Sequence, residues 1–202
     1  MKFLKSLILL SVVMQTITPD ARNEQEIKIR IAIAKSRFQQ MHKILTAQKT
    51  TFTLRYRLLE CYVFSVLFYG CETWTLTKVL TQKLEACEMW MLRRMGQISW
   101  KARVTNEEVL KRLNISRNLL PKIQSRKLVY FGHIKRHDSI MKDILEGRLE
   151  GTRARGRPRA QWSDNIREWA GCGLMECTRL ASDRERWRHV SHQPLPRAGT
   201  KK

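Results

Sequence analysis

Apolar side chains recur at helical spacing near the start of the chain. From residue 27 they follow one another every three or four positions, as in a helix packed on a neighbour, at Ile27, Ile31, Ala34, Phe38, Met41 and Leu45. Asn23 precedes this stripe at a capping position, and Glu26 stands where a capping box has its acidic residue. The pattern predicts a helix from Asn23 to Leu45.

The same period predicts further helices up to residue 133. They are expected over residues 53–69, 77–95, 105–114 and 119–133. Thr105 and Glu108 form a capping box for the third of these helices, and Gly70 stands where the first can end. Glycines and a proline between Gly147 and Arg159 favour a linker or an extended arm. Short helices are expected around 161–169 and 180–190, so the fold class is mostly α.

The charge balance changes this picture from a generic helical protein to one suited to a polyanion. The 202 residues contain 39 Lys and Arg against 18 Asp and Glu, which gives a formal net charge of +21. A compact state with that much like charge repels itself, and a polyanion relieves the repulsion while releasing counterions. The excess is larger after residue 100, where Arg outnumbers Lys, and Arg forks onto phosphate and stacks on bases. A ribosome-like or membrane-surface protein is the alternative.

Cysteine usage and the N-terminus point to different compartments. The five cysteines form an odd set without framework spacing, which favours a reducing compartment, nucleus or cytoplasm. Lys2 and Lys5 accompany an apolar run from Leu7 to Met14 that resembles the core of a signal peptide. No small-x-small cleavage site follows, and the run is too short to span a bilayer. Secretion is therefore the alternative.

No pattern of catalytic residues is found. The aspartates, none of them adjacent to another, are Asp20, Asp138, Asp143, Asp164 and Asp183. Two-metal phosphoryl transfer needs carboxylates held together, and neither a glycine-rich phosphate loop nor a G-x-S-x-G nucleophile elbow occurs. We expect neither a catalytic site nor a cofactor.

One weak metal candidate is present near the C-terminus. Cys172, Cys177, His189 and His192 give a C-x4-C-x11-H-x2-H spacing. The second and third intervals are short for a zinc finger. The simpler interpretation places Cys172 in a turn and Cys177 at the start of a helix, with the histidines near its end.

The most informative short motif is Arg-rich. Gly156 and Pro158 keep the backbone extended between four arginines, Arg153, Arg155, Arg157 and Arg159. Such a ribbon favours backbone contacts with RNA or DNA, and the alternative is insertion into an A·T minor groove. The six tryptophans, Trp74, Trp90, Trp100, Trp162, Trp169 and Trp187, stand near basic residues. They suit base stacking, but core packing is expected for most, especially Trp90, Trp169 and Trp187.

Several ordered motifs carry a family resemblance. The first block is Tyr69-Gly70-Cys71-Glu72-Thr73-Trp74-Thr75-Leu76-Thr77, and Leu84-Glu85-Ala86-Cys87-Glu88-Met89-Trp90 with Arg93-Arg94-Met95 comes next. Later blocks are Arg126-Lys127-Leu128-Val129-Tyr130-Phe131-Gly132-His133, Gly156-Arg157-Pro158-Arg159 and Ala181-Ser182-Asp183-Arg184-Glu185-Arg186-Trp187. Together they resemble the region after the catalytic palm in LINE-type (non-LTR) retrotransposon reverse transcriptases with an N-terminal endonuclease.

The resemblance implies a thumb and C-terminal region without the palm and endonuclease, and therefore no polymerase activity. The resemblance covers about residues 17–190, and Met1 to Gln15 fits the family poorly. It implies a thumb-like helical domain at 17–146 and an Arg-rich arm with short C-terminal helices at 147–192. The sequence itself adds an apolar segment at 1–16 and a basic tail at 193–202 that is expected to be disordered. RNA and DNA are the expected partners. Besides the arm, the expected backbone contacts are Arg93, Arg94, Arg126 and Lys127. An uncovered apolar stripe on the first helix is expected to favour self-association. A co-opted structural or interaction protein without a nucleic-acid role is the alternative.

Overall fold

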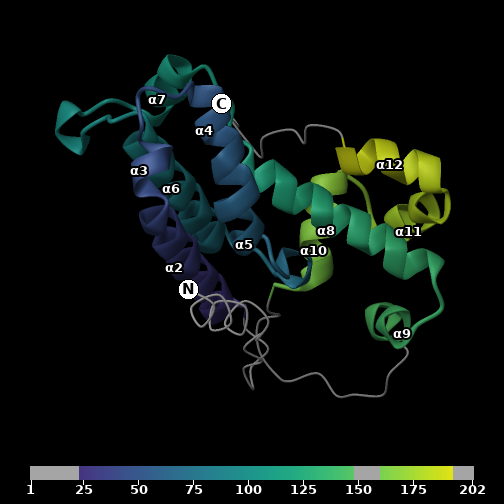
Figure 1. Ribbon diagram of the computed structural model, residues 1–202. Coiled ribbons are helices and arrows are strands. Elements are labelled where there is room, and N and C mark those ends of the chain that lie inside the picture. Colours follow the sequence, from purple (N-terminus) through teal and green to yellow (C-terminus); the bar gives the residue numbers. More distant parts are fainter. Residues whose placement is uncertain (1–22, 148–159, 193–202) are drawn as a thin grey trace. The chain divides into compact units, whose positions relative to one another are not determined.

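The computed structural model describes residues 23–147 and 160–192, and these residues are mostly helical, without a strand among them (Figure 1). The predicted mostly-α fold class is confirmed. The described residues divide into two compact units, the first made of residues 23–71 and 78–120 and the second of 72–77, 121–147 and 160–192. This division falls inside the segment 17–146 that we expected as one helical domain. The segments 1–16 and 193–202 lie outside the described residues.

The first unit is built from helices and short helical turns. In chain order they are α2 (Glu24–Gln40), α3 (His42–Leu45), α4 (Phe52–Leu59), the π-helical turn η1 (Glu60–Phe64), α5 (Ser65–Leu67), α6 (Lys78–Met95), the 3-10 turn η3 (Trp100–Ala102) and α7 (Asn106–Leu113). A further 3-10 turn, η2, covers Cys71–Thr73. The long helix α8 follows over Leu119–Arg136.

The first predicted helix is divided at Met41, where α2 gives way to α3. Asn23 occupies the N-cap position, but its side chain makes no capping hydrogen bond, so the predicted side-chain cap is wrong. The apolar stripe packs inside the first unit, because Ile27, Ala34 and Phe38 are fully buried. That stripe is therefore not uncovered, and the reason we gave for self-association does not hold.

Two buried side chains in the first unit join segments far apart in sequence. Arg55 Nη1 donates to the carbonyl oxygens of Leu45 at 3.0 Å and Met95 at 2.8 Å, which holds the C-terminal ends of α3 and α6 together. Glu88 Oε1 accepts hydrogen bonds from the backbone N–H groups of Asn118 and Leu119, each at 3.0 Å. This carboxylate satisfies donors that the start of α8 cannot pair within the helix. Burial raises the pKa of Glu88, and these two hydrogen bonds oppose the rise.

Local capping signals hold where the helix is short and exposed. Thr105 Oγ1 accepts from the N–H of Glu108 at 3.2 Å, which confirms the predicted N-terminus of α7. Asn114 ends the helix in the left-handed conformation, with φ +52°. Asn and Gly tolerate this conformation best, which explains why the helix ends there.

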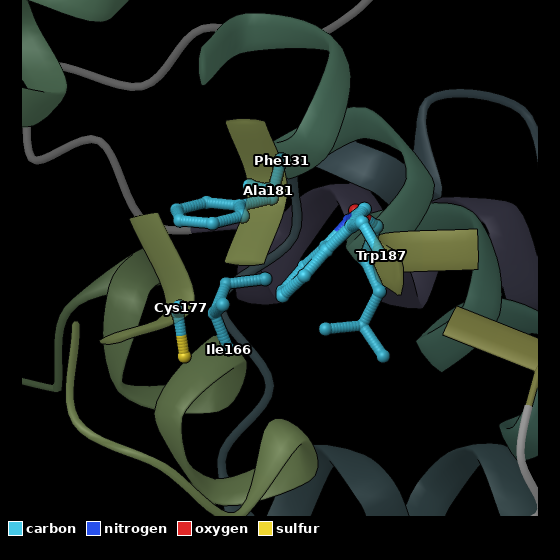
Figure 2. Close-up of a cluster of buried hydrophobic side chains, with 6 residues drawn as sticks. Phe131, Ile166, Cys177, Ala181 and Trp187 are labelled. Carbon is cyan, nitrogen blue, oxygen red and sulfur yellow. The ribbon is translucent and has the colours of Figure 1, made fainter. Parts of the chain in front are cut away.

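The second unit contains the part of α8 from residue 121 and the helices α9 (Ile140–Glu146), α10 (Trp162–Ala170), α11 (Leu174–Ser182) and α12 (Arg184–His192). Its core gathers side chains from α8, α10, α11 and α12 (Figure 2), namely Leu128, Phe131, Ile166, Cys177, Ala181 and Trp187. The helix expected around 180–190 is two helices, because Asp183 breaks it. Asp183 Oδ1 accepts from the N–H groups of Glu185 at 3.0 Å and Arg186 at 3.2 Å, so it caps α12.

Candidate nucleic-acid interface

One end of the first unit carries only basic formal charges. Residues 41–51 and 93–106, which we call the basic end, contain no Asp or Glu. Side chains join the two segments, since Gln48 Nε2 donates to Gln97 Oε1 at 2.7 Å and Gln97 Nε2 donates to the Thr46 carbonyl at 3.2 Å. The exposed cations of the basic end are Lys43, Lys49, Arg94, Lys101 and Arg103. Because neither segment contributes a carboxylate, the charges within them add rather than cancel, and the nearest acidic residues in the chain are Glu107 and Glu108 in the first turn of α7.

The loop over residues 97–104 is fixed by its own backbone and by Arg93. The Arg93 carbonyl accepts from the N–H of Ile98 at 2.8 Å, while Arg93 Nη2 donates to the Val104 carbonyl at 2.7 Å and to Asn106 Oδ1 at 2.9 Å. Arg93 therefore closes both ends of the loop. Gln97 with φ +54° and Arg103 with φ +49° adopt the left-handed conformation near its two ends.

The two predicted arginines of α6 have different environments. Arg94 is exposed, and its guanidinium lies 4.2 Å from the centroid of the Trp90 ring, so the planar cation is held in a stacked position. Arg93 is half-buried and its guanidinium donates to the loop. We therefore assign Arg93 to positioning the loop, and Arg94 remains a candidate for phosphate contact.

Arg126 lies on an exposed face of α8 in the second unit. Its Nη1 atom is 3.6 Å from Glu72 Oε1, and both residues line a shallow hollow with Tyr130 and His133. The side chains of Arg126 and Glu72 are 49% and 30% exposed, so solvent screens their attraction and the arginine can exchange the carboxylate for a phosphate.

Lys127 does not belong to an interface. It is fully buried, and its Nζ atom donates to the Trp74 carbonyl at 2.7 Å and to Asn165 Oδ1 at 2.8 Å. The rings of Trp162 and Trp169 lie 4.8 and 5.3 Å from the same atom. Burial lowers the pKa of Lys127 to about 7, and Asp164 opposes the shift. The prediction that Lys127 contacts a nucleic-acid backbone is wrong, because the side chain reaches inward.

Asn165 completes this buried polar arrangement. Its Oδ1 accepts from the Leu76 N–H at 2.8 Å, and its Nδ2 donates to the Leu76 carbonyl at 2.9 Å. One amide side chain thus makes both backbone hydrogen bonds of residue 76, as a neighbouring β-strand would. Trp162 Nε1 adds a hydrogen bond to the Glu72 carbonyl at 2.8 Å. Residues 72–77 are fixed within the second unit in this way.

The other predicted site residues are separated or lie outside the description. The arginines of the arm, Arg153, Arg155, Arg157 and Arg159, fall within residues 148–159, which the structure does not describe. The Sγ atoms of Cys172 and Cys177 are 2.8 Å apart. His189 and His192 do not join them, since no cluster of three potential metal ligands forms within residues 23–147 and 160–192. The four-residue zinc site is thus not assembled.

The tryptophans divide into three groups. Trp74 and Trp187 are buried, and Trp90, Trp162 and Trp169 are half-buried. The expectation of core packing is thus confirmed for Trp187, whereas Trp90 and Trp169 are only partly packed in the interior. Trp100 differs from all of them, since 80% of its surface is exposed. The sequence carries a signal for this difference, because Trp100 lies between helices and next to Lys101 and Arg103.

No family model, curated protein or solved structure matches this chain. The likeness to LINE-type reverse transcriptases therefore rests on the sequence motifs alone. Several of their residues have structural roles here, including Trp74, Lys127, Gly132 and Trp187 in the second unit. Among the described helices, none is both long enough and apolar enough to cross a membrane.

Proposed function

We propose that this chain binds RNA or DNA mainly through the phosphate backbone, and that it derives from the region after the palm of a LINE-type reverse transcriptase. The observation that carries the binding proposal is the basic end, where the exposed cations have no carboxylate in either segment. A polyanion recovers the free energy lost to their mutual repulsion and gains counterion release. The motif likeness supports the origin.

The binding is general rather than sequence-specific on this proposal. Lys49, Lys101 and Arg103 are exposed on turns, where their side chains follow a backbone rather than enter a groove as a fixed row. Phosphate contacts position a protein without carrying sequence information. The Arg-rich arm adds contacts of the same kind.

Binding is tested by fluorescence polarisation of labelled RNA and duplex DNA over a salt series. The variant Lys49→Ala with Arg94→Ala removes one lysine and one arginine from the basic end. The matched control, Arg57→Ala with Lys78→Ala, removes the same two charges from exposed positions elsewhere in the first unit. On B-DNA, the first variant is expected to reduce the slope of log K against log salt by about 1.8, which is two phosphate contacts, and the control by much less. Equal effects from both variants contradict an interface at the basic end, and an absence of salt-dependent binding contradicts the proposal.

On this proposal the chain binds nucleic acid but does not polymerise it. In a primer-extension assay with magnesium or manganese, we expect no template-dependent incorporation above background, because the sequence has no paired aspartates to hold the metal ions. Incorporation that depends on the template overturns this part of the proposal.

A further inference from the structure

Trp100 is a large aromatic side chain displayed to solvent. It is 80% exposed at the start of the turn η3, and its neighbours Ser99, Lys101, Ala102 and Arg103 are exposed as well. Leaving an indole in water forgoes one of the largest favourable burial terms of any side chain. Trp187 of the same chain is 2% exposed, so the fold has a way to bury a tryptophan. Within the described residues, Trp100 thus has a large aromatic face available to a partner.

The loop that carries Trp100 is held in one conformation at a cost. Gln97 and Arg103 are not glycines, so the left-handed backbone conformation costs roughly 1–2 kcal/mol at each of them. The hydrogen bonds of Arg93 to Val104 and Asn106 offset part of this cost and close the loop. Within the turn, Ser99 Oγ accepts from the N–H of Lys101 at 3.2 Å. The indole is thus presented on an ordered support, which lowers the entropy lost when it binds a flat partner.

We propose that Trp100 stacks on an unpaired base of single-stranded RNA or DNA, while Lys101 and Arg103 pair with the adjacent phosphates. The inference rests on the proposed nucleic-acid binding and deepens it by naming the strand state that this end of the molecule prefers. Every base has a π face, so one indole accepts any of them, whereas a base inside a duplex is already stacked. Basic side chains together with a stacking aromatic ring are the combination that single-strand binders use, and Lys101 and Arg103 supply the charges within three residues of Trp100.

The charge and the composition of the loop favour a nucleic acid over a lipid surface. An interfacial anchor usually presents several apolar side chains that enter the bilayer together. In the 97–104 loop, Trp100 is the one large apolar side chain that is exposed, since Ile98 and Val104 are half-buried. A single exposed ring accompanied by two exposed cations matches a base with its phosphates more closely than an acyl layer.

The test measures the affinity of the full chain for a labelled oligothymidylate of about 12 nucleotides, within the site sizes of single-strand binders. Two other probes are an oligonucleotide of the same length with abasic positions at alternate nucleotides and a duplex of the same length. Trp100→Ala is expected to weaken binding to the oligothymidylate about 5- to 100-fold. Trp100→Phe keeps a stacking ring and should restore most of the affinity. The abasic probe retains the phosphates, and the duplex has no free base. The affinity of Trp100→Ala for each of these two probes should therefore be less than about threefold below that of the wild type.

The matched control is Met175→Ala, which removes another exposed apolar side chain, 86% exposed, from the second unit. It should leave all three affinities unchanged. An equal loss on all probes for Trp100→Ala, or no loss on any, overturns the stacking proposal while the salt-dependent binding proposed above still holds. If the wild-type chain binds none of the probes, the proposed function fails as well. Vesicles of phosphatidylcholine and phosphatidylserine form the last arm, and binding there that needs Trp100, without a single-strand effect, assigns the loop to a membrane and overturns the proposal.

Discussion

The indole of Trp187 lies so close to Gly132 that a Cβ atom on residue 132 would be 2.6 Å from its Nε1 atom. This approach allows Trp187 Nε1 to donate a buried hydrogen bond of 2.7 Å to the Leu128 carbonyl of α8. The same ring packs against Phe131 with a centroid distance of 5.3 Å. Both side chains are labelled in Figure 2. A glycine inside α8 thus makes room for the largest side chain in the core of the second unit.

Gly132→Ala should destabilise the second unit. In an exposed helix the change gains up to about 1 kcal/mol from helix propensity. Here the new methyl group meets the indole of Trp187. Either α12 shifts to make room, or the buried Nε1–H loses its acceptor, and each of these outcomes costs roughly 1–3 kcal/mol. We expect a net loss of about 2 kcal/mol, measured as faster amide hydrogen exchange in α8 and α12.

The control for this substitution is Gly173→Ala, because a Cβ at residue 173 meets nothing within 4 Å. Residue 173 is the N-cap of α11 with ordinary extended backbone, φ −66° and ψ 155°. Alanine there should cost under about 1 kcal/mol. If the two alanines have the same effect, close packing of Gly132 on Trp187 is not what requires the glycine.

Lys127 should make the stability of the second unit depend on pH. Its pKa is lowered from 10.5 to about 7 in the folded chain, so between these values the unfolded chain binds a proton that the folded chain does not. Stability then rises with pH across this window, by at most about 1.4 kcal/mol for each pH unit. Lys127→Met removes the titrating group and should remove this slope in urea unfolding.

The comparison is best made from about pH 7 to roughly pH 8.5. Burial raises the pKa of Cys87 from 9.0 to about 11 and that of Cys177 from 9.0 to about 12, so their contribution to stability falls as the pH rises above 9. Below pH 9, the difference in unfolding free energy between wild type and Lys127→Met therefore reports the titration of the lysine. A constant difference means that the ammonium keeps its proton, held by the Trp74 and Asn165 oxygens.

Glu88 should be replaceable by glutamine but not by alanine. Its Oε1 atom accepts from two backbone N–H groups at the start of α8, while Oε2 is buried without a hydrogen-bond partner. Glutamine keeps the accepting oxygen and removes the need to bury a charge, so Glu88→Gln should stay within about 1 kcal/mol of wild type at neutral pH. Glu88→Ala leaves both donors unpaired and should cost roughly 1–3 kcal/mol in thermal or urea unfolding.

Helices with local signals could be predicted from the sequence, and their interruptions could not. The apolar period and the Thr105 cap were sufficient for α6, α7 and α8, since both act within a few residues. The division at Met41 was missed because the period of three and four continues through it. The break at Asp183 was missed for a different reason, since one side chain that caps α12 also ends α11.

The sequence predicted which residues of the candidate site are basic, but not which of them are exposed. Arg94 was singled out in the last turn of a predicted helix, where a basic side chain suits the negative end of the helix dipole, and the structure leaves it exposed. Lys127 looks the same in sequence, yet its partners Trp74 and Asn165 are 53 and 38 residues away, and only the fold reveals them. The sequence places Trp100 between two predicted helices and beside Lys101, but only the structure reveals its exposure and the closure of its loop by Arg93.

The Arg-rich arm allows two modes of binding to be separated by one double substitution, Arg155→Ala with Arg157→Ala. If these side chains contact phosphates, the change should weaken binding to duplexes of any sequence and reduce the salt slope by about two phosphate equivalents. A minor-groove hook predicts instead that the loss is greatest on A·T tracts, whose narrow groove concentrates negative potential around inserted arginines. We expect equal loss on A·T and G·C duplexes, measured by polarisation over the same salt series as for the basic end. If affinity and slope both stay at their wild-type values, the arm is a linker, and the basic end carries the binding by itself.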